Sequence, residues 1–513
     1  MAIEARRRDP ETGLGWSLPL PDGPEAGRRA ELLQREKQPK GLGESDHLIV
    51  LRDGRADHMG KGVTVIGSAQ RPLAPDTVGP GIDEPTFLRA ISIKAGTAKA
   101  HRFQNLYRHL DEQMLHHAWR TLNKKGAPGV DKVTIAQYGE NLDENIRRLV
   151  ERLKSNGYRS RLIRRKYIPK GKGKERPLGI PVVEDRLLQA AVRLLLEAIY
   201  EQDFLPASYG YRPKVGAGKA VGDLTYELQF GRYGYVVEAD IKGFFDHIDH
   251  DWLLRMLKER VDDKPLLGLI ETWLKAGILE RDGTILHPHS GTPQGGVISP
   301  VLANLYLHYV LDLWFEKRVK PNSEGQAHII RFADDFVCAF QYRGEAERFY
   351  EALPKRLQEF GLQVAQDKTK IHRFSRFHPT RKRRFTFLGF EFYWEADTKG
   401  VARVWRRTSR KKLQSGIQAC KEWLKANRNL RLPELLKTMK RKVRGHYNYF
   451  RAIGNVTSLW TYHKAVTELL YKWLNRRSQR RSLTWEKLNR LLKAVMFPTP
   501  SEAMQTLRNR GLA

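Results

Sequence analysis

The sequence has few cysteines and no long apolar run. Its two cysteines, Cys338 and Cys420, are too few for a disulfide framework or for a zinc site built from paired cysteines, which is typical of a protein in a reducing compartment. No stretch approaches the roughly 18 to 20 consecutive apolar residues that cross a bilayer, and the N-terminus lacks the apolar core of a signal peptide. Secretion and contact with a membrane are therefore not expected, and the predicted location is the cytoplasm.

Acidic residues are scarce beside basic ones. The 513 residues include 58 Asp and Glu against 91 Lys and Arg, so the formal net charge is +33. The chain is nevertheless 41% hydrophobic, which excludes a wholly disordered basic protein. Self-repulsion at this charge destabilises a compact state unless a polyanion neutralises it, and nucleic acid is the natural partner.

Composition divides the chain into three parts. Residues 1–98 are rich in Gly, Pro, Arg and Asp and are interpreted as a flexible leader, with a small folded domain as the alternative. Residues 99–397 mix helical periodicity with short β-prone runs, which predicts a large α+β domain. Residues 398–513 have mainly helical patterns, and 27 Lys and Arg against 5 Glu lie after residue 400, which predicts an all-α basic domain. Within it, apolar residues from Leu459 to Trp473 recur at helical spacing, and a helix-bundle core is the favoured interpretation of Trp473.

Adjacent acids separate two apolar, β-prone runs between residues 328 and 340. The intervening Ala333-Asp334-Asp335 predicts a hairpin with carboxylates at its turn, although such a pair alone usually means only a turn. A second strand-like run, residues 235–240, ends in Asp240, and a helix is expected from about Asp249. If this third acid lies beside the hairpin, the carboxylates need bound cations or raised pKa values. Two Mg²⁺ ions about 3.5–4 Å apart would satisfy them and support in-line phosphoryl transfer, so nucleotidyl transfer is the inferred reaction.

A glycine-rich segment, residues 290–300, lies between these two acidic segments and precedes a helical run. Glycines let a backbone approach a nucleotide closely, and a helix N-terminus favours negative charge. A simple turn before a buried helix is the alternative, and the nucleotide-facing interpretation is preferred because of the neighbouring acids.

In combination, these segments resemble the reverse transcriptases encoded by bacterial and organellar group II introns, also called intron maturases. Residues 239–246, 291–300 and 332–335 are similar to polymerase motifs A, B and C, in that order. Further segments resemble the fingers (126–131 and 168–181), the last palm motifs (361–370 and 387–390) and the thumb or maturase domain (444–450 and 476–485).

This resemblance implies a right-hand polymerase. The α+β fingers and palm, with an antiparallel sheet, would occupy residues 99–397, and an all-α basic thumb or maturase domain with a short tail would occupy residues 398–513. The implied function is that of an RNA-directed DNA polymerase of a group II intron, which copies intron RNA from deoxynucleoside triphosphates with two Mg²⁺ ions as cofactors. Intron RNA and target DNA would be its partners in splicing and mobility, and the implied location is the bacterial cytoplasm, at the nucleoid.

The resemblance also implies roles for single residues around the metal ions. Asp240, Asp334 and Asp335 would be the catalytic carboxylates that hold both ions, with the carbonyl of Ile241 as a further ligand.

Five residues are implied to handle the incoming nucleotide. Lys170 and Arg176 would meet its triphosphate, and Gln294 would contact the nucleotide. Phe245 would exclude the ribose 2′-hydroxyl, and Lys368 would protonate the pyrophosphate leaving group. The structural alternatives are solvated hairpin charges for the two cations and core packing for Phe245.

The basic C-terminal part is expected to bind RNA through Arg406, Arg407, Lys411, Lys412 and Arg444. A solvated basic face is the usual meaning of such a charge run, but its net charge of +22 exceeds what solubility needs.

The sequence departs from the family pattern in three places. Phe332 stands where the family usually has Tyr, so a hydroxyl is missing next to the acids. The paired cysteines of the zinc-containing endonuclease found in many relatives do not occur, so a second-strand nick is not expected. The first 98 residues match nothing in the family.

Two other functions remain open at this point. One is an RNA chaperone, that is, a maturase whose polymerase site is vestigial, although all three acids are present. The other is a group II-like reverse transcriptase that serves defence or repair without an intron.

Overall fold

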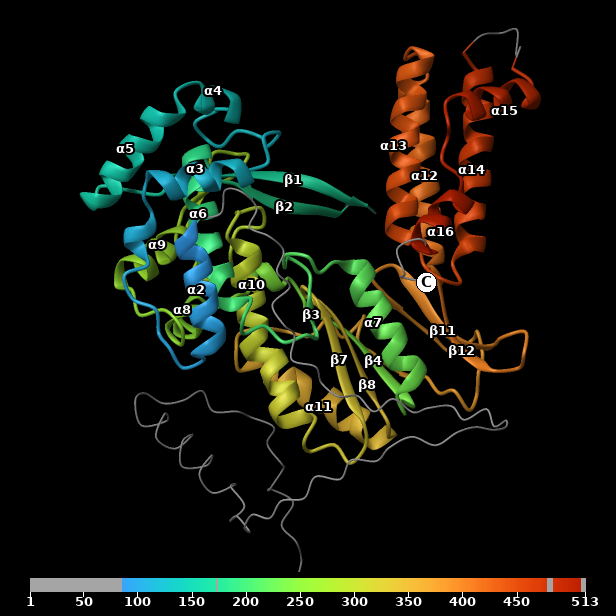
Figure 1. The fold of residues 1–513 in the computed structure, drawn as a ribbon, viewed down its shortest axis with the longest axis horizontal. Coiled ribbons are helices and arrows are strands. Elements are labelled where there is room, and N and C mark those ends of the chain that lie inside the picture. Colours follow the sequence, from blue (N-terminus) through green and yellow to red (C-terminus); the bar gives the residue numbers. More distant parts are fainter. Residues whose placement is uncertain (1–84, 172–173, 478–482, 509–513) are drawn as a thin grey trace, which may run out of the picture. The chain divides into compact units, whose positions relative to one another are not determined.

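The computed structural model describes residues 85–171, 174–477 and 483–508 (Figure 1). The predicted leader up to residue 84 and part of the second thumb-like segment, residues 478–482, lie outside the described residues. In the described part, no helix combines the length and the apolar composition needed to cross a bilayer.

The structure corrects the end of the predicted leader. It was expected to extend to residue 98, but Thr86–Thr97 form helix α2, which packs on α6 (Val183–Tyr200). Leu88, Ile91 and Ala95 recur at helical spacing and are all buried. The composition of the longer segment hid this short amphipathic helix.

Two stretches of the chain, residues 107–180 and 250–286, form mainly helices and a long hairpin. Side-chain caps define several helix starts: Asp111 accepts a hydrogen bond from the amide of Met114, and Thr134 forms a capping box with Gln137. The long β1–β2 hairpin belongs to a four-stranded sheet with the order β2-β1-β5-β6. The elements are η1 (Tyr107–His109), α3 (Glu112–Thr121), α4 (Ile135–Glu140), α5 (Leu142–Lys154), β1 (Ile163–Gly171), β2 (Lys174–Ile180), α8 (His250–Lys258), α9 (Lys264–Leu274), β5 (Ile278–Leu279) and β6 (Ile285–Leu286).

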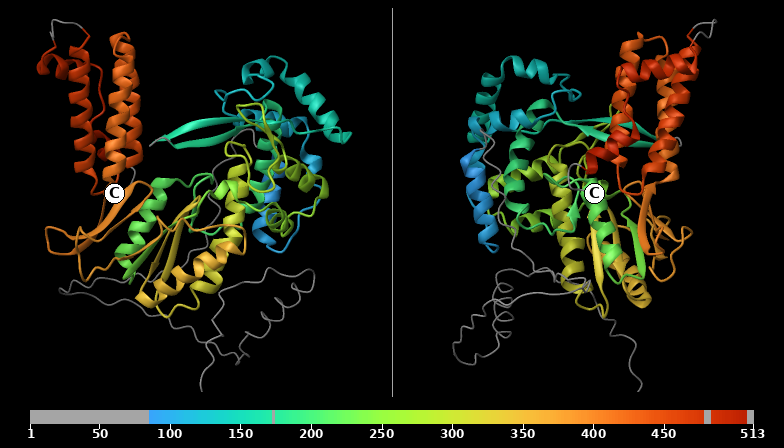
Figure 2. Two further views of the ribbon diagram at one scale, coloured as in Figure 1. Left: turned by 180° about the vertical axis from the view of Figure 1, so that it is seen from behind. Right: turned by 45° about the vertical axis from the view of Figure 1, so that its right-hand side comes forward.

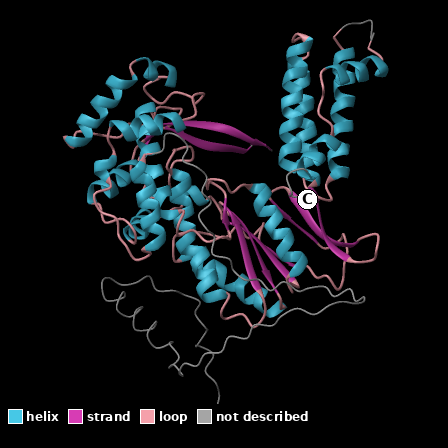
Figure 3. Cartoon of the chain, viewed as in Figure 1, coloured by secondary structure: helices cyan, strands magenta, loops and turns pink. Residues whose placement is uncertain are grey.

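A five-stranded sheet has the strand order β3-β7-β8-β4-β9. Figure 3 shows the strands of the protein in magenta among the cyan helices. The predicted strand at residues 235–240 and the predicted hairpin at 328–340 are both confirmed, as β4 and as β7 with β8. The predicted helix start is confirmed too, because the Asp249 side chain caps α8. The remaining elements here are β3 (Ser208–Tyr209), α7 (Ala217–Phe230), β4 (Tyr235–Asp240), η2 (Phe244–Asp246), α10 (Ser299–Leu307), η3 (His308–Asp312), η4 (Phe315–Val319), β7 (Ala327–Phe332), β8 (Asp335–Phe340), α11 (Arg343–Gln358) and β9 (Lys370–Arg373).

The C-terminal part begins with strands, not with the helix expected from residue 398. Strand β12 (Ala402–Thr408) pairs with β11 (Phe390–Ala396), which pairs with β10 (Arg384–Phe387). Val404 and Trp405 suit a sheet, and the first helix starts only where the hydroxyl of Ser409 accepts a hydrogen bond from the amide of Lys412.

Five helices follow these strands in the part of the chain that the structure describes. The helices α12, α13 and α14, orange to red, stand side by side in every view (Figures 1 and 2), and α14 contacts both of the others. The helix expected around residues 459–473 is confirmed as part of α14, and Trp473 is buried in its core face. One hydrophobic core continues from the five-stranded sheet through β10–β12 into these helices. The helices are α12 (Arg410–Asn427), α13 (Leu432–Phe450), α14 (Val456–Asn475), α15 (Trp485–Ala494) and α16 (Pro500–Arg508).

Candidate active site

The register of the central sheet brings three carboxylates together. Strand β8 pairs with β4 so that Asp335 lies directly opposite Asp240. Asp334 precedes Asp335 in a two-residue turn, whose first residue, Ala333, has a left-handed φ of 56°. Because opposite residues of antiparallel strands have Cβ atoms roughly 4.5–5.5 Å apart, the three acids share one end of the sheet.

Burial and mutual repulsion disfavour negative charge at this place. Burial, with the neighbouring charges of Asp240 and Asp334, raises the pKa of Asp335 to about 7. Burial also raises the pKa of Asp334, and so does Asp240, whereas Arg176 and Lys368 act in the opposite direction. The cluster is therefore short of positive charge, even in a very basic protein.

Lys368 supplies part of that charge through a direct contact with Asp240. The hydrogen bond from its ammonium group to Asp240 raises the pKa of Lys368. The backbone keeps this segment in place: the amide of Ala365 donates to the carbonyl of Asp240 over 2.8 Å, and the amide of Lys242 donates to the carbonyl of Gln363 over 2.8 Å.

The donor set suits a hard cation, although the described residues contain no ready-made cluster of three or more metal-binding side chains. Carboxylate and carbonyl oxygens are the ligands of Mg²⁺, which is often held by one or two carboxylates together with substrate phosphates. The Ile241 residue is buried and follows Asp240 directly, next to its bridge partner Val364. In this structure the ammonium of Lys368 is the positive charge that contacts Asp240.

Backbone hydrogen bonds join the glycine-rich loop to strand β2 and to the segment that follows β4. Its Thr292 amide donates to the carbonyl of Phe245 over 2.8 Å, and the Gly179 amide of β2 donates to the carbonyl of Gln294 over 2.7 Å. At Gly295, φ is 117° and a Cβ would lie 2.6 Å from the carbonyl oxygen of Gly179, so glycine is required there. Gln294 thus lies between β2 and the segment after β4.

Of the other residues implied to bind the nucleotide, the structure describes the side chains of Arg176 and Phe245 but not that of Lys170. Arg176 is exposed on β2, and its charge acts on Asp334. Phe245 is 9% exposed, and its ring meets that of Tyr211 edge to face at 6.3 Å. Tyr211 is half exposed, and burial together with Asp334 raises its pKa, so it lies near the acids and sequence reasoning missed it. Lys170 is in β1, but its side chain lies outside the described part of the structure.

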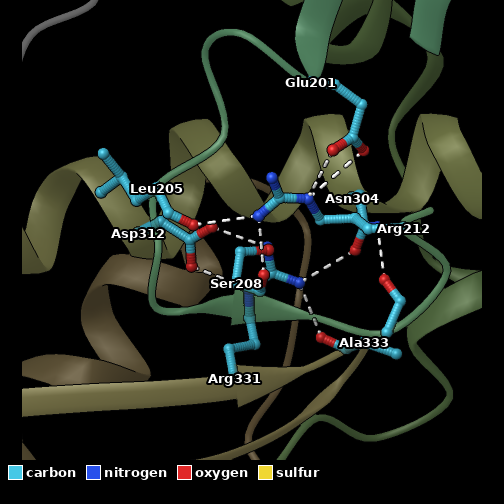
Figure 4. A network of polar contacts seen from close by, with 9 residues as sticks. Glu201, Leu205, Ser208, Arg212, Asn304, Asp312, Arg331 and Ala333 are labelled. Carbon is cyan, nitrogen blue, oxygen red and sulfur yellow. Dashed lines mark hydrogen bonds and ion pairs between the residues drawn. The ribbon is translucent and has the colours of Figure 1, made fainter. Parts of the chain in front are cut away.

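The buried guanidinium of Arg331 contacts the turn that carries Asp334 (Figure 4). Arg331 is fully buried and forms an ion pair of 2.6 Å with Asp312, which also accepts from Nε over 2.7 Å. Its remaining donors reach the Ala333 carbonyl at 2.9 Å, Asn304 Oδ1 at 3.1 Å and Ser208 Oγ at 2.5 Å. All five N–H groups of Arg331 are therefore used, and one of them holds the residue before Asp334.

A second residue missed from the sequence connects the C-terminal helices to the acids. The hydroxyl of Tyr449, on α13, donates to the carbonyl of Leu388 over 3.1 Å, and the backbone of Leu388 acts to lower the pKa of Asp335. Burial raises the pKa of Tyr449, and the charge of Asp335 contributes. Leu388 has a left-handed φ of 49° between β10 and β11. The phenol of Tyr449 is therefore placed beside the carboxylates.

The structure separates the five residues expected to bind RNA into two groups. Arg406 is a structural residue: its Nη1 donates to Thr225 Oγ1 over 2.5 Å, and burial lowers its pKa. Arg407 is paired with Glu391 at 3.0 Å. Both lie on β12, because the run that was expected to be helical is a strand there. Lys411, Lys412 and Arg444 are exposed on α12 and α13, where phosphate could reach them.

The sequence contains a signal for the buried ion pair but none for the two tyrosines. Arg331 follows two isoleucines in a β-prone run, and Asp312 is an acid inside an apolar helical run, so a buried ion pair could have been suspected. Tyr211 and Tyr449 carry no such signal, because their positions depend on segments distant in sequence.

Comparison with known proteins agrees with this geometry. Residues 168–392 match the family described as reverse transcriptase (RNA-dependent DNA polymerase). The chain is 38% identical over 232 residues to the group II intron-encoded protein LtrA of Lactococcus lactis subsp. cremoris, which is 44% of this chain and 38% of LtrA. The match therefore spans well under half of the length of that relative.

Two further relatives extend the comparison. Protein YkfC of Escherichia coli (strain K12) is 32% identical over 352 residues, which cover 62% of this chain and 90% of YkfC. The nuclear intron maturase 1, mitochondrial, of Arabidopsis thaliana is 32% identical over 95 residues, which cover 18% of this chain and 13% of the maturase. With the acids, the glycine-rich loop and the hairpin in the order of the family motifs, the chain belongs to the family of group II intron-encoded reverse transcriptases and maturases.

Proposed function

We propose that this protein is an RNA-directed DNA polymerase of a group II intron, which extends a DNA primer on an RNA template by two-metal nucleotidyl transfer. The observation that carries the proposal is the register that places Asp240 opposite Asp335, with Asp334 in the adjoining turn. Three acids whose charges repel one another and which lie near Lys368 and Arg176 form a site for cations and phosphates.

In this proposal Asp240, Asp334, Asp335 and the carbonyl of Ile241 hold two Mg²⁺ ions. The ions, when bound, activate the primer 3′-hydroxyl and stabilise the leaving oxygen. A cation held by Asp240 would compete with the ammonium of Lys368 for that carboxylate, and the freed ammonium would be the proton donor to pyrophosphate.

Other side chains position the nucleotide. Arg176 and Lys170, on the β1–β2 hairpin, neutralise the triphosphate, and Gln294 contacts the nucleotide from its loop. Phe245, supported by Tyr211, closes the space at the sugar, so deoxynucleotides are preferred.

The right-hand arrangement is also a proposal. The helices α2 to α6 with the β1–β2 hairpin would be the fingers, the five-stranded sheet the palm, and α12 to α14 the thumb and maturase domain. The exposed Lys411, Lys412 and Arg444 of these helices would bind intron RNA during splicing and mobility, with target DNA as the second nucleic-acid partner. These partners place the protein at the bacterial nucleoid.

Primer extension tests the polymerase against the chaperone with a vestigial polymerase site. The intact protein is expected to incorporate deoxynucleotides on an RNA template only with Mg²⁺. Asp334→Asn is expected to reduce the rate about a thousandfold, because the loss of one metal-binding charge costs roughly 4 kcal/mol of transition-state stabilisation. Asp251→Asn, the same change on an exposed position of α8, is the matched control and should leave the rate unchanged.

The outcomes separate the candidates. Protein that binds RNA but incorporates nothing supports the chaperone and refutes the polymerase. Activity that survives in Asp334→Asn would show that the acids at this end of the sheet are not the catalytic centre. For the intron itself, the DNA that flanks the gene should encode a catalytic intron RNA, and its absence would favour a role in defence or repair.

A further inference from the structure

A pocket of about 430 Å³ opens at the end of the central sheet remote from the carboxylates. Three segments form it: the approach to β4, the end of β8 and the segment that follows β9. Tyr235 lines the pocket at the first residue of β4, whereas Asp240 is the last, so five residues of strand, roughly 17 Å, separate the two places. The pocket is therefore distinct from the candidate active site.

The walls of the pocket are fixed by backbone hydrogen bonds. The Gly234 amide donates to the carbonyl of Phe340 over 2.9 Å, and the Phe374 amide donates to the carbonyl of Gly234 over 2.8 Å. The guanidinium of Arg376 also donates to the carbonyl of Gly231. Because these bonds join all three segments, the pocket exists without a ligand and its ligand would not have to order it.

The pocket is strongly positive. Arg232, Arg373 and Arg376 line it, and the lining contains neither Asp nor Glu among the described residues. Within the same part of the chain, the side chains of Arg232 and Arg373 have no ion-pair or hydrogen-bond partner, unlike Arg407 with Glu391 or Arg343 with Glu347. Two guanidinium groups thus remain available for an anion.

Two exposed aromatic side chains, Phe377 and Tyr342, also line the pocket. Phe377 is 82% exposed, which is the highest value among the large apolar residues that the structure describes, and Tyr342 is 50% exposed. A phenyl ring this open to water contributes little to the packing of the fold, and its face is accessible to a ligand that stacks on it. Aromatic rings beside arginines are the combination on which unpaired bases stack while their phosphates are neutralised.

We infer that this pocket binds one nucleotide unit of a single-stranded nucleic acid, with the base against Phe377 and Tyr342 and the phosphate on Arg232 and Arg373. An acidic peptide would use the arginines but not the rings, and a duplex would hide its bases within its stack. RNA and DNA share the required chemistry. The inference stands without the proposed polymerase activity, because it uses no residue of the carboxylate cluster.

Photocrosslinking to the full-length protein tests the inference. The probe is a twelve-nucleotide single-stranded RNA or DNA that carries one photoreactive 4-thio-pyrimidine, added in the presence of a saturating primer–template duplex that occupies the candidate active site. The crosslink is expected in the peptide that contains residues 373–377. Probe affinity, measured by fluorescence anisotropy, is expected to fall about tenfold in Phe377→Ala, because stacking of one base has this order of effect. It is also expected to fall in Arg373→Gln, because this change removes a charge that neutralises the phosphate.

Matched variants make the result interpretable. Arg383→Gln removes the same charge from an exposed arginine outside the pocket lining and should leave probe affinity unchanged. The midpoint of urea denaturation should be equal in all three variants, which shows that they are folded. A preference for the RNA or the DNA probe identifies the source of the nucleotide.

Three outcomes would overturn the inference. These are a crosslink confined to other peptides, equal losses in Arg383→Gln and Arg373→Gln, or displacement of the probe by polyglutamate as effectively as by unlabelled oligonucleotide. The last outcome would indicate a general anion site or an acidic protein partner.

Discussion

Replacing Arg331 with Met should separate the stability of the central sheet from the position of its acidic turn. Arg331 and Asp312 are both essentially unexposed, so the single change leaves a buried carboxylate without its partner. Breaking such a pair costs about 3–5 kcal/mol, which is a large part of the total stability of an ordinary domain. Arg331→Met alone is therefore expected to be severely destabilised.

The double variant, Arg331→Met with Asp312→Leu, tests whether Arg331 also positions the acidic turn. Replacing both members of a buried pair by apolar residues of similar size is close to neutral, so the part of the loss that comes from the unpaired Asp312 carboxylate should return. The Ala333 carbonyl, however, still lacks the donor that lay 2.9 Å away. A displacement of about 1 Å at a reacting group can reduce the rate about a hundredfold, so the double variant should be stable but slow.

The assays are urea denaturation and steady-state primer extension. The control is Arg356→Met, which removes another buried arginine, one that bonds the carbonyls of Tyr309 and Val310 and pairs with Glu359. It should lose stability but keep kcat in the molecules that remain folded. A double variant with restored stability and normal kcat would refute the positioning role of Arg331.

Three other expectations follow from single side chains. Charge reversal of Lys411 and Lys412 should weaken RNA binding and flatten its salt dependence by about one unit of slope per lysine, and an unchanged slope in filter binding would contradict phosphate contact. Phe245→Ala should raise ribonucleotide incorporation at least tenfold relative to deoxynucleotides in single-nucleotide extension, and unaltered discrimination would leave Phe245 as a core residue only. Burial lowers the pKa of His308 to about 4, so the neutral ring stabilises the fold fully above pH 6.5, and this contribution, up to about 3 kcal/mol, is lost as the pH falls toward 4. Urea denaturation of His308→Phe should therefore show a smaller loss between pH 6.5 and 4.5, and an equal loss would show that other groups cause it.

Local patterns were sufficient for much of the fold. The β-prone runs around Asp334 and at residues 235–240, the Asp249 cap and the apolar spacing of α14 each express a preference of neighbouring residues, and all are confirmed. The same reasoning failed at residues 402–408, which were expected to belong to an all-α domain and form strand β12. Strand β11 beside them decides the conformation there, because Phe390, Phe392 and Trp394 are buried and require a pleated partner.

The sequence by itself determined which chemical groups this protein has: three acids in two motifs, a glycine-rich loop between them, and a formal charge of +33 that favours a polyanionic partner. Only the tertiary structure decided which groups meet. The pairing of β4 with β8 sets Asp240 against Asp335, the buried Arg331 holds their turn, and Tyr449 reaches them from a helix more than a hundred residues later. Strand register and long-range packing depend on the free energy of the whole core, which no local pattern contains.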